Sequence, residues 1–222
     1  EDRTFLIPQD MSYDVAVLIE PFSVGTHGVN VPNAKPGDHV VVYGVGPIGI
    51  SSISALIAKG ITPVAVVRSN AKRAFLEKAG AIVCNINEVD KFDFLRETFG
   101  TTLHRNRYPA IDVDIVIDAA GGPEVIADFL QLGKPKAKLS VMSVVFDPFP
   151  VPVLRLMSME AIIMGSCGFD PSDIREVIDN LDSGRTLMPE IVTSHYKLDQ
   201  INEAMEMAHD HTQSIKVVID ME

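Results

Sequence analysis

The residues with the clearest chemical meaning are a glycine-rich run, Tyr43-Gly44-Val45-Gly46-Pro47-Ile48-Gly49. It follows a short apolar stretch and precedes one with helical apolar spacing. Gly44 permits a tight turn, Gly46 lets the backbone approach a pyrophosphate, and Gly49 allows close helix–strand packing. The free N–H groups of the helix start would face the phosphates. The run therefore predicts dinucleotide binding at residues 44–49, and glycines that serve only packing are the alternative.

The end of the second apolar stretch bears on which dinucleotide binds. NAD-binding folds place an Asp or Glu there to hold the ribose 2′-hydroxyl, but this chain continues into Arg68, Ser69 and Asn70, without an acid. Lys72 and Arg73 follow. A guanidinium reads a 2′-phosphate well, and Ser69 can donate a hydrogen bond to it. We therefore favour NADP(H) over NAD(H), with an ordinary solvated helix start as the alternative.

Two later strand ends offer further cofactor contacts. Small residues follow Asp118, and at Ala120 they would let a nicotinamide or adenosine pass close to the backbone. Ser143 and Val144 occupy a similar place after the next apolar stretch. Helix capping is the alternative for both. Ala120 and Val144 are thus additional candidates for cofactor binding.

Six short apolar runs alternate with helical patterns, and these runs must position the residues above. They lie at residues 39–43, 63–67, 81–84, 113–117, 138–145 and 161–164. Strands so short and apolar are typically buried on both faces, with helices as right-handed crossovers. The pattern predicts an α/β fold: a doubly wound, six-stranded parallel Rossmann sheet with helices on both faces.

Two flanking segments do not belong to that repeat. Residues 1–29 form a helical remnant, with a helix expected from Ser12 to Asn30 and an interruption at Pro21. Residues 30–166 form the dinucleotide-binding domain. Residues 167–222 form a small α+β appendage with two helices and a closing strand. The appendage is too small to hold a core of its own, so we expect it to dock on the rest.

Composition excludes several classes of function. The chain has 222 residues, 46% of them hydrophobic, and a formal net charge of −11. That charge argues against nucleic acid or an anionic membrane as a partner, and no apolar run reaches a membrane span. Cys84 and Cys167 are too few for a disulfide framework, which favours a reducing compartment, the cytoplasm. Cys84 is expected to be a small core residue.

Residues 16–27 and 35–49 together resemble the medium-chain, zinc-dependent alcohol dehydrogenases, especially their branch of sorbitol, polyol and sugar-acid dehydrogenases. The resemblance extends through residues 191–198 and 216–219. It implies hydride transfer between a nicotinamide cofactor and a secondary alcohol or its ketone. In that family, a segment like residues 167–222 returns to a catalytic domain built mainly from an N-terminal half. No counterpart of that half lies in this sequence, and the missing initiator Met fits a cut in a longer chain.

The resemblance also bears on metal and catalysis. Glu20 matches a position where the polyol branch places a glutamate at its zinc, but one carboxylate is not a zinc site. The other ligands belong to the absent half, so zinc is expected in a full-length parent and not in this chain. No catalytic residue is assigned here, and structural roles are expected for His27 and His195. The chain alone is expected to be inactive.

Other interpretations remain open. A zinc-independent, quinone-reductase-type oxidoreductase shares this cofactor fold, although Glu20 favours the zinc branch. A cofactor-binding module without catalysis is a second alternative, and a methyltransferase a weaker third. The expected partners are a nicotinamide dinucleotide, an alcohol or ketone in the full protein, and a second copy of the chain. We expect that homodimer to form through residues 156–164, since an exposed edge strand is a pairing template.

Overall fold

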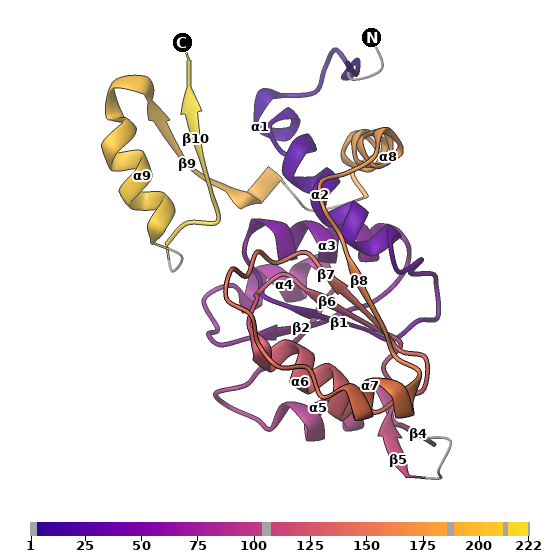
Figure 1. Ribbon diagram of the computed structural model, residues 1–222. Coiled ribbons are helices and arrows are strands. Elements are labelled where there is room, and N and C mark those ends of the chain that lie inside the picture. The colour runs from indigo at the N-terminus through magenta and orange to yellow at the C-terminus, as the bar shows by residue number, and fades with distance from the viewer. Residues whose placement is uncertain (1–3, 104–107, 186–188, 211–212, 222) are drawn as a thin grey trace.

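The computed structural model describes residues 4–103, 108–185, 189–210 and 213–221, and its centre is a six-stranded, all-parallel sheet (Figure 1). The strand order is β3-β2-β1-β6-β7-β8. The strands are β1 Val40–Tyr43, β2 Val64–Val67, β3 Ile82–Asn85, β6 Ile115–Asp118, β7 Lys138–Val141 and β8 Ile162–Gly165. The predicted sheet is confirmed. Its order reverses between β1 and β6, and ligands of such sheets bind at the carboxyl ends of strands there.

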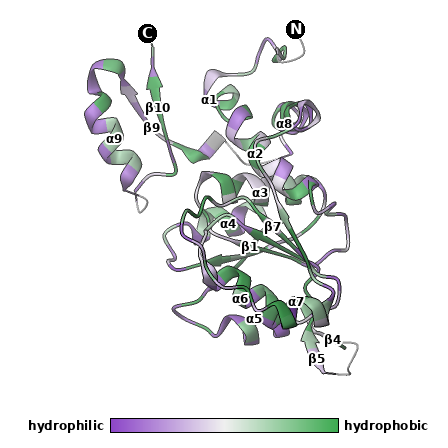
Figure 2. Cartoon of the chain, in the orientation of Figure 1, coloured by the Kyte–Doolittle hydropathy of each residue, from purple (hydrophilic) through white to green (hydrophobic). Residues whose placement is uncertain are grey.

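Helices cover both faces of the sheet, as predicted. One face carries α2 Ile19–Asn30, α3 Pro47–Ala58 and α4 Arg73–Ala79, and the other carries α5 Lys91–Phe99, α6 Pro123–Leu132 and α7 Val153–Met159. In β1, Val40 and Val42 belong to the first core, and Val41 and Tyr43 to the second. Both faces of the strand are buried, which explains its uniformly apolar sequence. In Figure 2, β1 and much of α6 carry the hydrophobic colour.

Helix α2 crosses α3 at close range because both helices carry small residues. A Cβ added at Gly25 would lie 1.9 Å from Ser51 Oγ, and Ser52 Oγ donates to the Gly25 carbonyl at 3.2 Å. The expected interruption at Pro21 was wrong. The chain breaks instead between α1 (Tyr13–Ala16) and α2, and Pro21 lies in the first turn of α2, where its missing N–H leaves no helical bond unmade.

Helix α8 (Pro171–Asp182) docks on α2 through a buried polar network. Asp173 is 2% exposed, and its carboxylate accepts from Asn30 Nδ2 at 2.7 Å and lies 2.8 Å from His27 Nδ1. Lys59 Nζ pairs with Glu176 at 2.7 Å. This part of the appendage therefore docks on α2 and, through Lys59, on the end of α3, and His27 takes part in that contact.

The end of the chain forms a separate lobe, which Figure 1 shows standing away from the main sheet. Its strands β9 (Val192–Lys197) and β10 (Lys216–Asp220) pair in parallel, and α9 (Ile201–His209) connects them. Ile191, at its start, is buried in the first core. A two-stranded sheet leaves two open edges and is marginal by itself.

A small antiparallel pair, β4 (Thr101–Leu103) with β5 (Pro109–Ile111), lies beyond the predicted repeat. The longest described helices, α2, α3 and α8, have 12 residues each. Within the described ranges, none of the helices has the length and apolar character that crossing a bilayer requires.

Candidate functional site

The glycine-rich turn connects β1 to α3 at the carboxyl edge of the sheet. Gly44 has a φ of +89°, which favours glycine, and a Cβ there would lie 2.9 Å from the Ala119 backbone. A Cβ at Gly49 would lie 2.0 Å from the Gly44 carbonyl oxygen. Glycine is therefore required at these two positions, at Gly44 by the tight turn and at Gly49 by the close contact between helix and strand.

Gly46 differs from Gly44 and Gly49 because packing within the chain does not require a glycine there. Its φ is −73°, which any residue adopts, and a Cβ there would meet no protein atom within 4 Å. It is the N-cap of α3, with Pro47 in the first helical position. The N–H groups of Ile48 and Gly49 belong to the first turn, which has no helical acceptors. Open space and free donors at a helix start are what an anion requires.

A cavity of about 420 Å³, here called the loop cavity, adjoins this turn. Its walls include Gly44, Val45, Gly46, Pro47, Ser69, Lys72, Ala120 and Ser214. Lys72 Nζ donates to the Val45 carbonyl at 3.1 Å, and burial lowers the pKa of this ammonium group. A half-buried cation beside free N–H groups makes the cavity attractive to phosphate.

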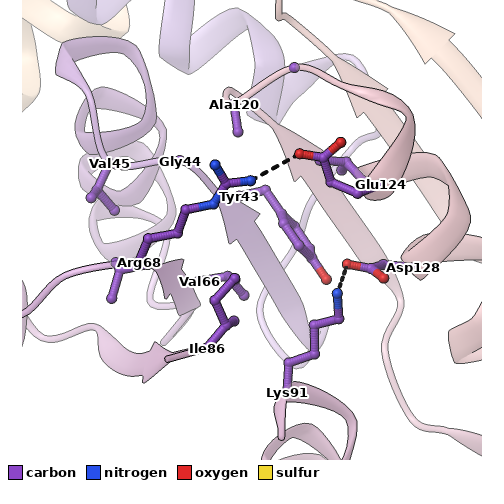
Figure 3. Close-up of a pocket in the computed structure, with 13 residues that line it drawn as sticks. Tyr43, Gly44, Val45, Val66, Arg68, Ile86, Lys91, Ala120, Glu124 and Asp128 are labelled. Atoms are coloured by element: carbon purple, nitrogen blue, oxygen red, sulfur yellow. Dashed lines mark hydrogen bonds and ion pairs between the residues drawn. The ribbon is translucent and has the colours of Figure 1, made fainter. Parts of the chain in front are cut away.

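A second cavity of about 300 Å³, the tyrosine cavity, lies between the end of β2 and helix α6 (Figure 3). Arg68 Nη2 pairs with Glu124 Oε1 at 3.0 Å, and Arg68 lines both cavities. Deeper inside, Lys91 forms an ion pair with Asp128. Burial, and next the nearby Asp128 carboxylate, raise the pKa of the Tyr43 phenol.

Asp118 organises the loop that separates β6 from α6. Its buried carboxylate accepts from the N–H groups of Ala120 and Gly121 at 3.0 and 2.8 Å, and from Ser143 Oγ at 2.9 Å. Ala120 thereby reaches the wall of both cavities. Asp118 thus holds the loop but does not cap α6, whose N-cap is Gly122 without a side-chain hydrogen bond.

Three predicted residues, Val144, Arg73 and Ile48, line neither cavity. Val144 is 79% exposed, since β7 ends at Val141, not at residue 145, and the chain then turns toward Asp118. Arg73 lines neither cavity, because its guanidinium contacts Glu77 and Glu88. Ile48 lines neither cavity, and what it offers a ligand is its backbone N–H in the first turn of α3. The remaining predicted residues, Gly44, Val45, Gly46, Pro47, Arg68, Ser69 and Ala120, each line at least one, and Gly49 lies behind the turn.

The polar residues of the tyrosine cavity were not predicted from the sequence. Asp128 lies on the buried face of α6 between apolar neighbours, and Lys91 is the first residue of α5. One signal was available: an Asp on the apolar face of a predicted helix needs a partner. Nothing in the sequence identified Lys91 as that partner.

The described residues do not fit a catalytic zinc site. Glu20 is exposed in the first turn of α2 and belongs to neither of the two described groups of possible ligands. Those groups are His27 with Asp170 and Asp173, and His39 with Asp112 and Asp114. Both histidines already contact protein acceptors through Nδ1, at 2.8 and 2.6 Å. Neither group contains a cysteine, which is a common ligand of zinc.

The sequence is similar to that of known dehydrogenases. Residues 47–183 match the model of the family described as zinc-binding dehydrogenase. The sorbitol dehydrogenase of Bacillus subtilis is 30% identical over 211 residues, which are 94% of this chain and 57% of the relative. The chain thus spans less than two thirds of the length of such relatives.

Solved structures share the fold. An Escherichia coli alcohol dehydrogenase complexed with NADH superposes with a TM-score of 0.84 at 22% identity, over 98% of this chain and 62% of the other. A Sinorhizobium meliloti protein described as a zinc-binding dehydrogenase and bound to NADP gives 0.82 at 21% identity, with the same coverage, 98% and 62%. The family match covers more than half of the sequence. The chain therefore belongs to the zinc-binding dehydrogenase family of oxidoreductases.

Proposed function

We propose that this chain binds one nicotinamide dinucleotide and forms the cofactor portion of a dehydrogenase for secondary alcohols such as polyols. The observation that carries the proposal is the pair of cavities flanking the glycine-rich turn, with open space at Gly46 and the Lys72 ammonium beside it. The sorbitol dehydrogenase among the relatives supports the polyol class.

The sheet order suggests how the dinucleotide lies. The pyrophosphate would rest on residues 44–49 and near Lys72, at the start of α3. The adenosine half would lie toward the end of β2, where such folds read the ribose, and its base would enter the tyrosine cavity beside Arg68. The nicotinamide would extend toward β6 and β7. When bound, the nicotinamide supplies the acceptor or donor of the hydride.

Of the two dinucleotides, which differ in a phosphate on the adenosine ribose, we favour NADP(H). Arg68 and Ser69 line the loop cavity just after β2, where NAD-binding folds put an acid and this chain has none. Glu124 opposes this preference, because its carboxylate already pairs with Arg68 and would repel a 2′-phosphate. Fold relatives were solved with NADH and with NADP, so direct titration of both cofactors must decide.

We further propose that residues 1–29 and 167–222 belong to a second domain completed by sequence outside this chain. The open edges of the β9–β10 pair and the exposed Tyr13 on α1 support this division. Zinc and the alcohol-binding residues would lie in that domain. The proposed homodimer would form at β8, the edge strand of the main sheet, where Ile162 and, on α7, Leu154 and Met157 are exposed.

Fluorescence titration with NADH and NADPH tests the binding proposal. We expect saturable binding of one dinucleotide per chain. In the wild type NADPH should bind more tightly, and Arg68→Ala should lose that preference. Equal NADPH affinity in Arg68→Ala would reject the role given to Arg68. Turnover of sorbitol and zinc content, measured on the full-length protein, test the dehydrogenase proposal. Light scattering that finds one chain per particle at high concentration would reject the dimer.

A further inference from the structure

We infer that Asp128 and Lys91, at the floor of the tyrosine cavity, determine base specificity by reading the polar edge of an adenine. The inference rests on the proposed function, because it assumes that the adenosine half of the cofactor enters this cavity. It goes further in naming the residues that distinguish one purine from another.

The polar floor of this cavity comes from two helices on one face of the sheet. Asp128 on α6 is 7% exposed and forms an ion pair with Lys91, the first residue of α5. The Tyr43 side chain runs from β1 toward that pair, as Figure 3 shows, and the tyrosine is 6% exposed. All three residues line the cavity. A buried ion pair is costly to desolvate, so its retention at a cavity floor calls for a reason.

Hydrogen-bonding capacity at this floor is incompletely used. Lys91 bonds to Oδ2 of Asp128, and because a carboxylate has about four acceptor sites, this group can accept further hydrogen bonds. The Tyr43 hydroxyl is close enough for Asp128 to raise its pKa, yet it makes no hydrogen bond of normal geometry within the described residues. Lys91 has three N–H donors, of which one is used. The floor therefore offers acceptor sites on Asp128 and donors on Lys91 and on the buried Tyr43 hydroxyl, and a ligand with the complementary pair would satisfy them.

Adenine carries that complementary pair. Its exocyclic N6 amine donates, and the adjacent ring nitrogen N7 accepts. N6–H would donate to Asp128 Oδ1, and Lys91 Nζ would donate to the ring nitrogen. Hypoxanthine has a carbonyl oxygen in place of the amine, so it would bring an acceptor against the carboxylate.

The walls of the cavity suit a flat aromatic ring. Val66, Ile86 and Val125 supply apolar contact from β2, from the loop after β3 and from α6. The Arg68 guanidinium lies at the mouth, joined to Glu124 (Figure 3), and a planar guanidinium can stack on a base. Apolar walls supply affinity for any purine, so discrimination depends on the polar floor.

The experiment compares NADH with its hypoxanthine analogue, both followed by nicotinamide fluorescence, and repeats the comparison with the 2′-phosphorylated pair. For the wild-type chain we expect the adenine form to bind about 10- to 100-fold more tightly, as for loss of a hydrogen bond to a charged group. Asp128→Asn should reduce the ratio to about 3 or less, because an amide can turn either its oxygen or its nitrogen toward the base. Asp93→Asn is the matched control, since Asp93 lies on α5 outside the cavity, paired with Arg96, and the ratio should stay at the wild-type value.

Three results overturn the inference. They are a wild-type ratio near one, an Asp128→Asn chain that weakens both forms by the same factor, and a ratio lowered equally by Asp93→Asn. The wild-type ratio needs no variant, so the inference can fail even if Asp128→Asn does not fold. Absence of binding by either form in the wild type would instead overturn the proposed function and the inference with it.

Discussion

Gly49→Ala should destabilise the chain and weaken cofactor binding at the same time. The added Cβ would lie 2.0 Å from the Gly44 carbonyl oxygen, whereas ordinary contacts begin at 3.4 Å. The turn or the helix must therefore retreat by about 1.4 Å. Overpacking of this kind costs about 1–3 kcal/mol, which for a chain of this size lowers Tm by roughly 2–12 °C. A phosphate-binding turn displaced by that amount should also lose affinity, by about 10-fold or more.

Gly46→Ala is the matched control because its Cβ meets no protein atom within 4 Å. Its Tm should stay within about 2 °C of the wild type, while dinucleotide affinity falls as the methyl group occupies the space proposed for the phosphates. Thermal unfolding followed by circular dichroism, together with NADPH titration, separates the two variants. The reasoning is refuted if Gly49→Ala keeps both the wild-type Tm and the wild-type affinity, or if Gly46→Ala loses stability as much as Gly49→Ala does.

The remaining predictions concern charge, docking and thiols. Lys72→Met should weaken NADH and NADPH by similar factors, about 10-fold, because its ammonium adjoins the proposed pyrophosphate position; a selective loss of NADPH would contradict that placement. Asp173→Ala should lower the free energy of unfolding by about 2–4 kcal/mol, since the donors from Asn30 and the Asp170 N–H lose a buried acceptor; a urea melt unchanged from the wild type would show that the network does not hold α8. Burial raises the pKa of the Cys84 thiol to about 11, whereas Cys167 is exposed. One thiol per native chain should therefore react rapidly with a disulfide reagent at pH 8, and Cys167→Ser should abolish that phase; rapid labelling of Cys84 would contradict its burial.

The fold could be predicted because its central strands β1, β2 and β6 are buried on both faces. Such strands are rich in apolar residues, and all six strands were visible as short apolar runs between helical patterns. Boundaries were less accurate where turn chemistry decides them. The run at residues 138–145 continues to look like a strand after Val141, but Asp118 draws Ser143 out of the sheet. The β4–β5 pair was missed because its strands have three residues each.

The site was predicted as far as local sequence determines it. The glycines of the turn could be predicted because backbone geometry alone requires them, and a sequence motif records that requirement. The structure shows the requirement for Gly44 and Gly49, where a Cβ would lie too close to backbone atoms. Whether a lysine or arginine side chain reaches the cavities depends on its partners in the folded structure, which sequence spacing does not reveal. Arg73 contacts two glutamates outside the cavities, and Lys72 is the neighbour that reaches the turn. Asp128 and Lys91 are 37 residues apart in sequence and meet only because α5 and α6 cover the same face.

The central claim is that one nicotinamide dinucleotide occupies the cavities beside the glycine-rich turn. Isothermal titration of the wild-type chain with NADPH and with NADH tests it most directly. The account predicts saturable binding of one molecule per chain, with NADPH the tighter ligand. No heat of binding and no protection from thermal unfolding at millimolar concentrations of either dinucleotide would contradict it.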